Sequence, residues 1–233
     1  MKIGIIGAMD VEVAHLKEVM EITATKTIAS QEYFDGKIGN TDVVVVQCGI
    51  GKVRAGMCVQ VLKDVFGVTH VLNTGVAGSL NNDINVGDVV VSTDAIFHDV
   101  NAINFGYALG EVPGMGTVSF AADPTLRQLA KEAVEKAAPE VNVFEGRIAT
   151  GDQFICEKEK KNWIRENFHA ECTEMEGCAI AEAAYLNQLP FVIIRAISDK
   201  ADEESQITYD EFEAKAAIHC SKIVEYMIAN MHA

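Results

Sequence analysis

The sequence predicts an α/β fold, a single domain in which a central mixed β-sheet carries helices on both faces. Apolar, β-branched runs of strand length alternate with segments of helical periodicity, as in α/β proteins. Two neighbouring runs are joined through Gly39-Asn40, which indicates an antiparallel hairpin and makes the sheet mixed. The run over residues 191–197 is almost continuously apolar and stops at Ser198-Asp199, as a buried strand does when it ends at a ligand-binding edge.

Six apolar runs are predicted to form strands of this sheet. They cover residues 2–6, 42–48, 70–73, 87–92, 141–149 and 191–197. The hairpin pairs residues 31–38 with 41–47. We expect residues 1–233 to form one domain, because 49% of the chain is hydrophobic and no linker or repeat interrupts it.

Three segments are predicted to be helical. Asp123-Pro124 is an N-cap followed by proline at the first helical position. Residues 174–184 are rich in alanine and glycine, so their helix can approach the sheet closely and hold its carboxylates in place. Thr208 and Glu211 have capping-box spacing, which places the start of the last helix there. Its apolar stripe is Phe212, Ala216, Cys220, Ile223 and Met227.

Residues 94–118 lack a clean periodicity but contain aromatic side chains, among them Phe105 and Tyr107. A long irregular segment of this kind is typical of a lid or an interface. A self-packed surface loop is the alternative.

The composition argues against several classes of partner. The formal net charge of −15 disfavours nucleic acid and anionic membrane surfaces, which attract clustered Lys and Arg. The first apolar run is too short to span a membrane. The six cysteines have no Cys-x-x-Cys spacing, which favours reduced thiols and a cytoplasmic location. The histidines lack helical metal-binding spacing, so no metal site is expected.

The glycine motifs do not indicate a nucleotide cofactor. Gly4 and Gly7 lack the full Gly-x-Gly-x-x-Gly spacing, and Lys52 is not followed by the Ser or Thr of a P-loop. No cofactor is therefore expected. The glycines of residues 49–51 and 73–78 follow apolar strands, so they let a ligand approach the backbone at the same sheet edge as Asp199. Simple tight turns are the alternative.

Three carboxylates are candidates for catalysis or binding. Glu12 lies near the start of the helix after the first strand, where the helix dipole favours its charged form. Glu176 lies on the alanine-rich helix, and Asp199 follows the buried strand. Each has a bland interpretation, as a first-turn glutamate, a surface glutamate or an N-cap. Their convergence at one sheet edge favours an active site.

The chain resembles the bacterial 5′-methylthioadenosine/S-adenosylhomocysteine nucleosidases of the nucleoside phosphorylase superfamily over essentially its whole length. The resemblance rests on residues 1–9 with Glu12, and on 73–78, 151–155, 174–176 and 195–202. It implies a nucleoside phosphorylase-like fold and hydrolysis of 5′-methylthioadenosine and S-adenosylhomocysteine to adenine and the 5′-substituted ribose. It also implies action on 5′-deoxyadenosine and a role in methionine salvage and in recycling the by-products of S-adenosylmethionine.

The resemblance also implies roles for residues. Asp199, helped by Ser198, would protonate N7 of the leaving adenine, while Glu12 would take a proton from the attacking water. Arg195 would help to fix Glu12 and the water. This is the acid-and-base logic of inverting sugar hydrolysis.

Binding roles follow from the same resemblance. Glu176 would hold the ribose hydroxyls and Met175 would pack on the sugar. Phe154 would stack on adenine, whose edge the Ile155 backbone would read. The apolar pocket for the alkylthio group would be formed by Met9, Ile50 and Tyr209, joined by Phe105 and Pro113 from the neighbouring subunit of a homodimer. Val76, Ala77, Gly78, Thr173 and Glu174 would complete the site.

Two departures and three rivals stay open at this point. Val76 stands where many of these nucleosidases have serine, and Tyr209 stands where phenylalanine is common. A purine nucleoside phosphorylase would share the fold but needs positive donors for phosphate. A nucleosidase for a related substrate such as aminodeoxyfutalosine would use the same acid and base. A non-catalytic nucleoside sensor would not need Glu12 and Asp199 together.

Overall fold

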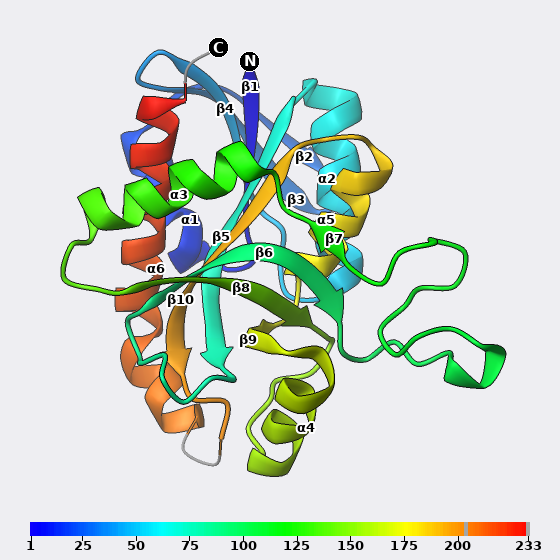
Figure 1. Cartoon of the computed structure of the whole chain (residues 1–233). Coiled ribbons are helices and arrows are strands. Elements are labelled where there is room, and N and C mark those ends of the chain that lie inside the picture. Colours follow the sequence, from blue (N-terminus) through cyan, green and yellow to red (C-terminus); the bar gives the residue numbers. More distant parts are fainter. Residues whose placement is uncertain (203–204, 232–233) are drawn as a thin grey trace.

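The computed structural model describes residues 1–202 and 205–231, and its strands join in a single mixed sheet (Figure 1). The strands within these residues are β1 (Lys2–Gly7), β2 (Glu21–Ile28), β3 (Gln31–Ile38), β4 (Thr41–Gln47), β5 (His70–Ser79), β6 (Val89–Phe97), β7 (Phe120–Ala121), β8 (Val143–Thr150), β9 (Ala170–Glu174) and β10 (Phe191–Asp199). Their order is β10-β6-β8-β9-β5-β1-β4-β3-β2, with β7 paired to β6.

Strand β5 is a branch point of the sheet. It pairs with β1, β9 and β10, so β10, β6, β8, β9 and β5 close into a ring while β1, β4, β3 and β2 extend from it. Parallel pairs such as β5–β10 and antiparallel pairs such as β3–β4 occur together. The predicted hairpin is therefore confirmed, with Ile38 opposite Thr41 across the Gly39-Asn40 turn.

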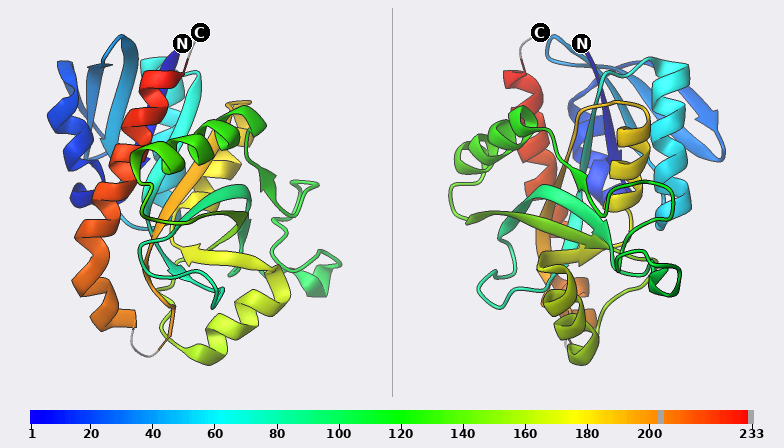
Figure 2. Two further views of the ribbon diagram at one scale, coloured as in Figure 1. Left: turned by 60° about the vertical axis from the view of Figure 1, so that its left-hand side comes forward. Right: turned by 45° about the vertical axis from the view of Figure 1, so that its right-hand side comes forward.

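Helices cover both faces of the sheet, which confirms the predicted fold class. They are α1 (Asp10–Val19), α2 (Lys52–Phe66), α3 (Pro124–Ala137), α4 (Lys158–Phe168), α5 (Gly177–Leu186) and α6 (Ser205–Asn230). Helices α1, α3 and α6 pack together on one face, and α2 and α5 pack together on the other (Figures 1 and 2). No helix in the described part of the chain is both long and apolar enough to span a membrane.

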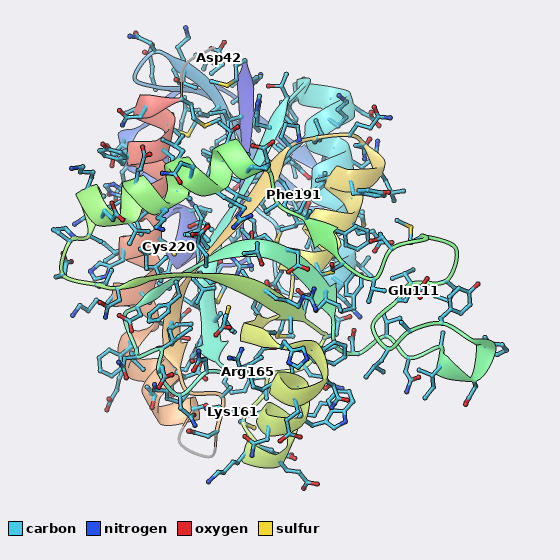
Figure 3. All side chains as sticks on the ribbon, in the orientation of Figure 1. Asp42, Glu111, Lys161, Arg165, Phe191 and Cys220 are labelled. Atoms are coloured by element: carbon cyan, nitrogen blue, oxygen red, sulfur yellow. The ribbon has the colours of Figure 1, made fainter. Side chains whose placement is uncertain are left out.

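Side chains between these layers form the core. The apolar residues of β1, β4, β5 and β10 are almost all fully buried, as expected for strands covered on both faces. Cys220 of α6, labelled in Figure 3, donates a hydrogen bond from its Sγ to the Gly75 carbonyl oxygen of β5 at 3.2 Å. Helix α6 is thus fixed directly behind the segment of β5 that carries the site.

The start of α3 agrees with its sequence signal. Asp123 is the N-cap, and its Oδ1 accepts hydrogen bonds from the backbone nitrogens of Thr125 and Leu126 at 3.0 and 2.9 Å. The predicted start of the last helix was wrong. Helix α6 already begins at Ser205, whose Oγ accepts from the Asp202 backbone nitrogen at 2.6 Å.

Several elements differ from their sequence predictions in extent. Strand β5 continues from the predicted 70–73 through Ser79, because its later residues still pair with β10 and, at Gly78 and Ser79, with β9. Strands β2, β7 and β9 were not predicted. β2 is exposed along nearly its whole length, β7 has two residues and β9 has five, so none shows a strong apolar period.

The irregular segment predicted over 94–118 is confirmed from residue 98 onward. Within it only the short 3₁₀ turn Ile103–Phe105 is regular. Figures 1 and 2 show this segment standing away from the body of the molecule, and Glu111 marks it in Figure 3. Phe105 is 84% exposed, so an aromatic side chain lies in solvent in the single chain.

Candidate active site

A cavity of about 330 Å³ opens where β1, β5, β9 and β10 end. The residues that line it are Ala8, Met9, Glu12, Ile50, Val76, Ala77, Gly78, Phe154, Thr173, Glu174, Met175, Glu176, Ser198, Asp199 and Tyr209. The fold therefore brings residues from seven separate parts of the sequence to one edge of the sheet, which is the edge at which α/β sheets bind ligands.

Glu12 is held at the start of helix α1 by backbone amides. Its Oε2 accepts from the nitrogens of Ala8 and Met9 at 2.6 and 3.0 Å, and its Oε1 accepts from the nitrogen of Val76 at 3.0 Å. Burial raises the pKa of Glu12, and it outweighs the opposing effects of Arg195 and the three amides. A buried glutamate with a raised pKa is suited to accept a proton near neutral pH.

Glycine at position 75 is required by this arrangement. A Cβ there would lie 2.5 Å from Glu12 Oε1 and 2.9 Å from Arg195 Nη1. Both charged side chains therefore pass close to the Gly75 backbone. The absence of a side chain on β5 leaves room for the carboxylate to reach the Val76 amide.

Asp199 lies at the end of β10 beside Gly78 of β5. Its Oδ1 accepts from the Ala201 nitrogen at 2.8 Å, and its Oδ2 accepts from Ser198 Oγ at 2.9 Å. The side chain is buried, and burial raises its pKa despite these hydrogen bonds. Asp199 can therefore hold a proton at a higher pH than an exposed aspartate and deliver it to a bound ligand.

Glu174 organises the floor of the cavity. Its Oε2 accepts from Arg195 Nη2 at 2.5 Å and from the Gly177 nitrogen at 2.6 Å, while its Oε1 accepts from Thr150 Oγ1. Arg195 Nη2 also donates to Asn73 Oδ1 at 2.7 Å. Burial tends to lower the pKa of Arg195, but Glu174, Glu12 and Glu176 outweigh it and raise that pKa, so the guanidinium stays charged.

Glu176 is the N-cap of α5. The sequence had suggested a position within the helix. Its Oε1 accepts from the backbone nitrogen of Gly51 at 2.8 Å. Burial and the neighbouring Glu174 raise the pKa of Glu176 to about 8. The carboxyl group is thus fixed between the start of α5 and the turn that precedes α2.

The other end of the cavity is apolar. The Phe154 and Tyr209 rings meet edge to face with their centroids 5.8 Å apart, and Tyr209 Oη donates to Met9 Sδ at 3.2 Å. Phe154 is 44% exposed and Ile50 is 54% exposed. Both therefore have free surface to offer a ligand.

Four predicted site residues do not line the cavity. Arg195 lies behind it and hydrogen-bonds Glu174 and Asn73, so its contact with Glu12 is electrostatic. The Ile155 side chain packs in a separate core cluster with Leu80. Phe105 and Pro113 belong to the projecting segment, whose role was predicted for the neighbouring subunit.

The residues that hold other site residues in place by hydrogen bonds were not identified from the sequence. Asn73 ends an apolar run within β5 and Thr150 ends β8, and they hold Arg195 and Glu174 by hydrogen bonds. A polar residue at the end of a buried strand is the signal that could have found them. Ala8 carries no such signal, because it contributes its backbone nitrogen to Glu12.

The arrangement offers acid–base chemistry on a largely apolar ligand. Two buried carboxyl groups, Glu12 and Asp199, lie beside Val76 and Gly78 of β5, and Glu176 and the exposed aromatic Phe154 line the same cavity. Such a site can protonate one part of a ligand and deprotonate a water near another.

Comparison with known proteins gives consistent matches over the whole chain. The model of the phosphorylase superfamily matches residues 2–229. The 5′-methylthioadenosine/S-adenosylhomocysteine nucleosidase of Shewanella frigidimarina is 42% identical over 226 residues, which cover 96% of this chain and 97% of that protein.

Solved structures are similar to this chain over essentially its whole length. The enzyme of the same name from Neisseria meningitidis, in complex with methylthio-immucillin-A, has a TM-score of 0.95 and 36% identity, covering 99% of each chain. Futalosine hydrolase of Helicobacter pylori has a TM-score of 0.93 and 32% identity, covering 99% of this chain and 98% of its own.

Proposed function

Because the chain belongs to the phosphorylase superfamily and, within it, to the 5′-methylthioadenosine/S-adenosylhomocysteine nucleosidases, we propose how its own cavity carries out that family's reaction. The protein is an N-glycosidic hydrolase that releases adenine from 5′-methylthioadenosine and S-adenosylhomocysteine.

The observation that carries hydrolysis over phosphorolysis is the charge of the cavity wall. Glu12, Glu174, Glu176 and Asp199 line it, and no Lys, Arg or His does so among the residues described. The nearest guanidinium, that of Arg195, is engaged by Glu174 and Asn73. A phosphate ion would meet carboxyl groups and no cation with which to pair, whereas a water molecule needs only a base.

In the proposed mechanism, Asp199 donates its proton to N7 of adenine while the bond between C1′ and N9 breaks. Positive charge then builds on the ribose as an oxocarbenium-like state. Glu12 takes a proton from water as the water oxygen bonds to C1′ on the opposite face of the sugar. The products are adenine and the 5′-substituted ribose, with inversion at C1′. Ser198 supports Asp199 through its 2.9 Å hydrogen bond.

The remaining lining residues bind the substrate in this proposal. Glu176 accepts hydrogen bonds from the ribose hydroxyls, and Met175 packs on the sugar. Phe154 stacks on adenine, next to the backbone of Ile155. The apolar group formed by Met9, Ile50 and Tyr209 receives the 5′ substituent, where each buried methylene contributes about 0.8 kcal/mol.

The two departures from the family pattern have different expected effects. Val76 contributes its backbone nitrogen to Glu12, and that contact does not depend on the side chain. Tyr209 adds a hydroxyl that donates to Met9 Sδ. We therefore expect Val76 to leave the base in place and Tyr209 to affect the choice of 5′ substituent.

Related adenine nucleosides form a second candidate substrate class. The likeness to a futalosine hydrolase supports action on aminodeoxyfutalosine through the same acid, base and ribose contacts. We also propose activity on 5′-deoxyadenosine, a role in methionine salvage, and the cytoplasmic location expected from the sequence.

We further propose a homodimer in which Phe105 and Pro113 reach the neighbouring site. Helices α2 and α5 pack side by side and present exposed apolar side chains, including Val53 (74% exposed) and Leu186 (61% exposed). A hollow lined mainly by apolar residues lies between these helices and the start of the projecting segment. An apolar face of this kind is suited to a second copy of the chain.

Adenine release from 5′-methylthioadenosine tests the function. The assay is run in phosphate-free buffer and with added phosphate, and the sugar product is identified. We expect free 5-methylthioribose in both buffers. Formation of 5-methylthioribose 1-phosphate only with phosphate would assign the chain to phosphorolysis, and a parallel assay with aminodeoxyfutalosine tests the second substrate class.

A further inference from the structure

Lys52, the first residue of helix α2, joins three separate segments of the chain. Its Nζ donates to Asp99 Oδ2 at 2.6 Å and lies 3.9 Å from Asp152 Oδ2. Its backbone nitrogen donates to Asp152 Oδ1 at 2.9 Å. The triangle closes through the Asp152 backbone nitrogen, which donates to Asp99 Oδ2 at 3.0 Å. We call Lys52, Asp99 and Asp152 the clamp.

The clamp is partly sheltered from water. The side chains of Lys52 and Asp99 are 23% and 15% exposed, and the Lys52 ammonium lies over the Phe97 ring at 5.3 Å from its centroid. Burial tends to raise the pKa of Asp99, but the hydrogen bonds from Lys52 and the Asp152 amide outweigh it and lower that pKa. The aspartate is therefore charged at neutral pH, and the pair is stronger than a fully exposed one.

Each segment that the clamp holds reaches the cavity or the proposed interface. Gly51, adjacent to Lys52, donates its backbone nitrogen to Glu176. Asp152 precedes Phe154 by two residues in the loop that follows β8. Asp99 is the second residue of the irregular segment after β6, which carries Phe105. None of the three clamp residues lines the cavity.

From these contacts we propose that the clamp is a positioning device. It sets the ribose-binding wall at Glu176 and the adenine-binding wall at Phe154 at the correct separation, and it ties both to the segment directed at the partner subunit. This assignment rests on the proposed function for the meaning of the two walls. Lys52, Asp99 and Asp152 act through their neighbours and do not touch the substrate.

Lys52→Met tests the proposal, because it removes the charge while keeping much of the aliphatic stem. The KM for 5′-methylthioadenosine is expected to rise about tenfold with kcat changed by less than about threefold, since misplacement of binding groups costs up to about a hundredfold. Lys52→Arg keeps the charge and is expected to recover part of the loss. Lys2→Met is the matched control, because Lys2 pairs with Asp35 at 2.8 Å with similar exposure.

Hydrogen–deuterium exchange gives a readout that does not depend on turnover. The backbone amides of Gly51, Lys52 and Asp152 are expected to exchange faster in Lys52→Met than in the wild type or in Lys2→Met. If Lys52→Met does not fold, Asp99→Asn takes its place under the same criteria.

The outcomes separate the clamp from the function. Unchanged KM and unchanged amide exchange in Lys52→Met would overturn the proposed role of the clamp. An equal rise in KM in Lys52→Met and Lys2→Met would overturn it as well. A raised KM with faster local exchange supports it. If the wild type releases no adenine, the proposed function fails, and the exchange measurement alone decides whether the clamp holds the two walls.

Discussion

Glu12 and Asp199 are both buried acids, but their surroundings suit them to opposite tasks. Glu12 is held by three backbone amides and lies near Arg195, which favour its charged form. Asp199 has one amide and two serine hydroxyls, and the nearby Asp202 acts against ionisation. In both residues burial is the largest influence and raises the pKa. This difference in partners is the physical basis for assigning Glu12 as base and Asp199 as acid.

Replacement of the proposed acid gives a direct test. Asp199→Asn is expected to lower the rate of adenine release by about 10²- to 10⁴-fold, the contribution of a general acid, while nucleoside binding stays measurable by calorimetry. Asp83→Asn, at an exposed position, is the control. Near-normal turnover in Asp199→Asn would rule out its role as acid.

Glu176 gives a prediction on pH. Its pKa is about 8 in the folded protein against a usual value of 4.5, so the folded state holds a proton that the unfolded state has lost between these values. Stability is therefore expected to fall as pH rises from about 4.5 to about 8. Glu176→Gln removes this contribution and is expected to flatten the decline in Tm of the ligand-free protein.

The comparison for this prediction is Glu132→Gln, on the exposed side of α3. It is expected to keep the wild-type decline. Glu12 and Asp199, whose pKa values are also raised by burial, leave a residual slope in Glu176→Gln. An identical pH dependence in Glu176→Gln and the wild type would contradict the high pKa of Glu176.

At the scale of elements, the site depends on where strands end and helices begin. The sequence indicates these points well where apolar runs are long, as in β10, or where a cap is explicit, as at Asp123. The sequence does not indicate a strand where only pairing with a neighbouring strand stabilises it, as in β2, which is exposed but pairs with β3. The predicted start of α6 was wrong because Thr208 and Glu211 have the spacing of a capping box but lie inside the helix, which begins at Ser205.

The same limit applies to the site itself. The motif residues could be placed at one sheet edge because their strands end in polar groups. The hydrogen-bond partners of Arg195 could not be predicted from spacing, because Glu174 and Asn73 come from strands that are distant in sequence. Glu176 was assigned to a helix that in fact begins one residue later.

The N-cap of α3 gives a prediction for an element. Asp123→Ala is expected to lower the free energy of unfolding by about 1 kcal/mol, because two backbone amides lose their acceptor. Urea titration measures the change. Activity at saturating substrate should be unaffected, since no cavity-lining residue belongs to α3. Glu135→Ala, exposed on the same helix, is the control, and an equal loss there would refute the capping contribution.

At the scale of the whole molecule, the sheet and the projecting segment have different relations to solvent. The sheet is covered on both faces by helices, whereas part of the segment over residues 98–119 projects from the body of the molecule, with Phe105 exposed (Figure 2). The exposed apolar surface of α2 and α5 lies beside the start of this segment. A protein assembled through this face would bury both features at once.

Val53→Glu tests this assembly. A charge at this exposed apolar position of α2 is expected to shift the proposed dimer toward monomer in sedimentation, since a buried unpaired charge is costly. The kcat/KM for 5′-methylthioadenosine should fall as Phe105 and Pro113 leave the partner's site. Ile218→Glu on α6, where Ile218 is 45% exposed, should change neither. A Val53→Glu protein that stays dimeric would place the interface elsewhere.

The position of β5 as a branch point constrains how this enzyme can diverge. The last residues of β5 pair with β9 and β10 and lie against the charged side chains of Glu12, Arg195 and Asp199, so that Gly75 and Gly78 have no room for a Cβ. Variation in this strand would disturb the acid and the base together. Substitutions at Ile50, Tyr209 and the projecting segment, which have free surface, are therefore the more accessible route to a new substrate preference. The catalytic strand is constrained by packing, whereas the residues around the opening of the cavity are free to vary.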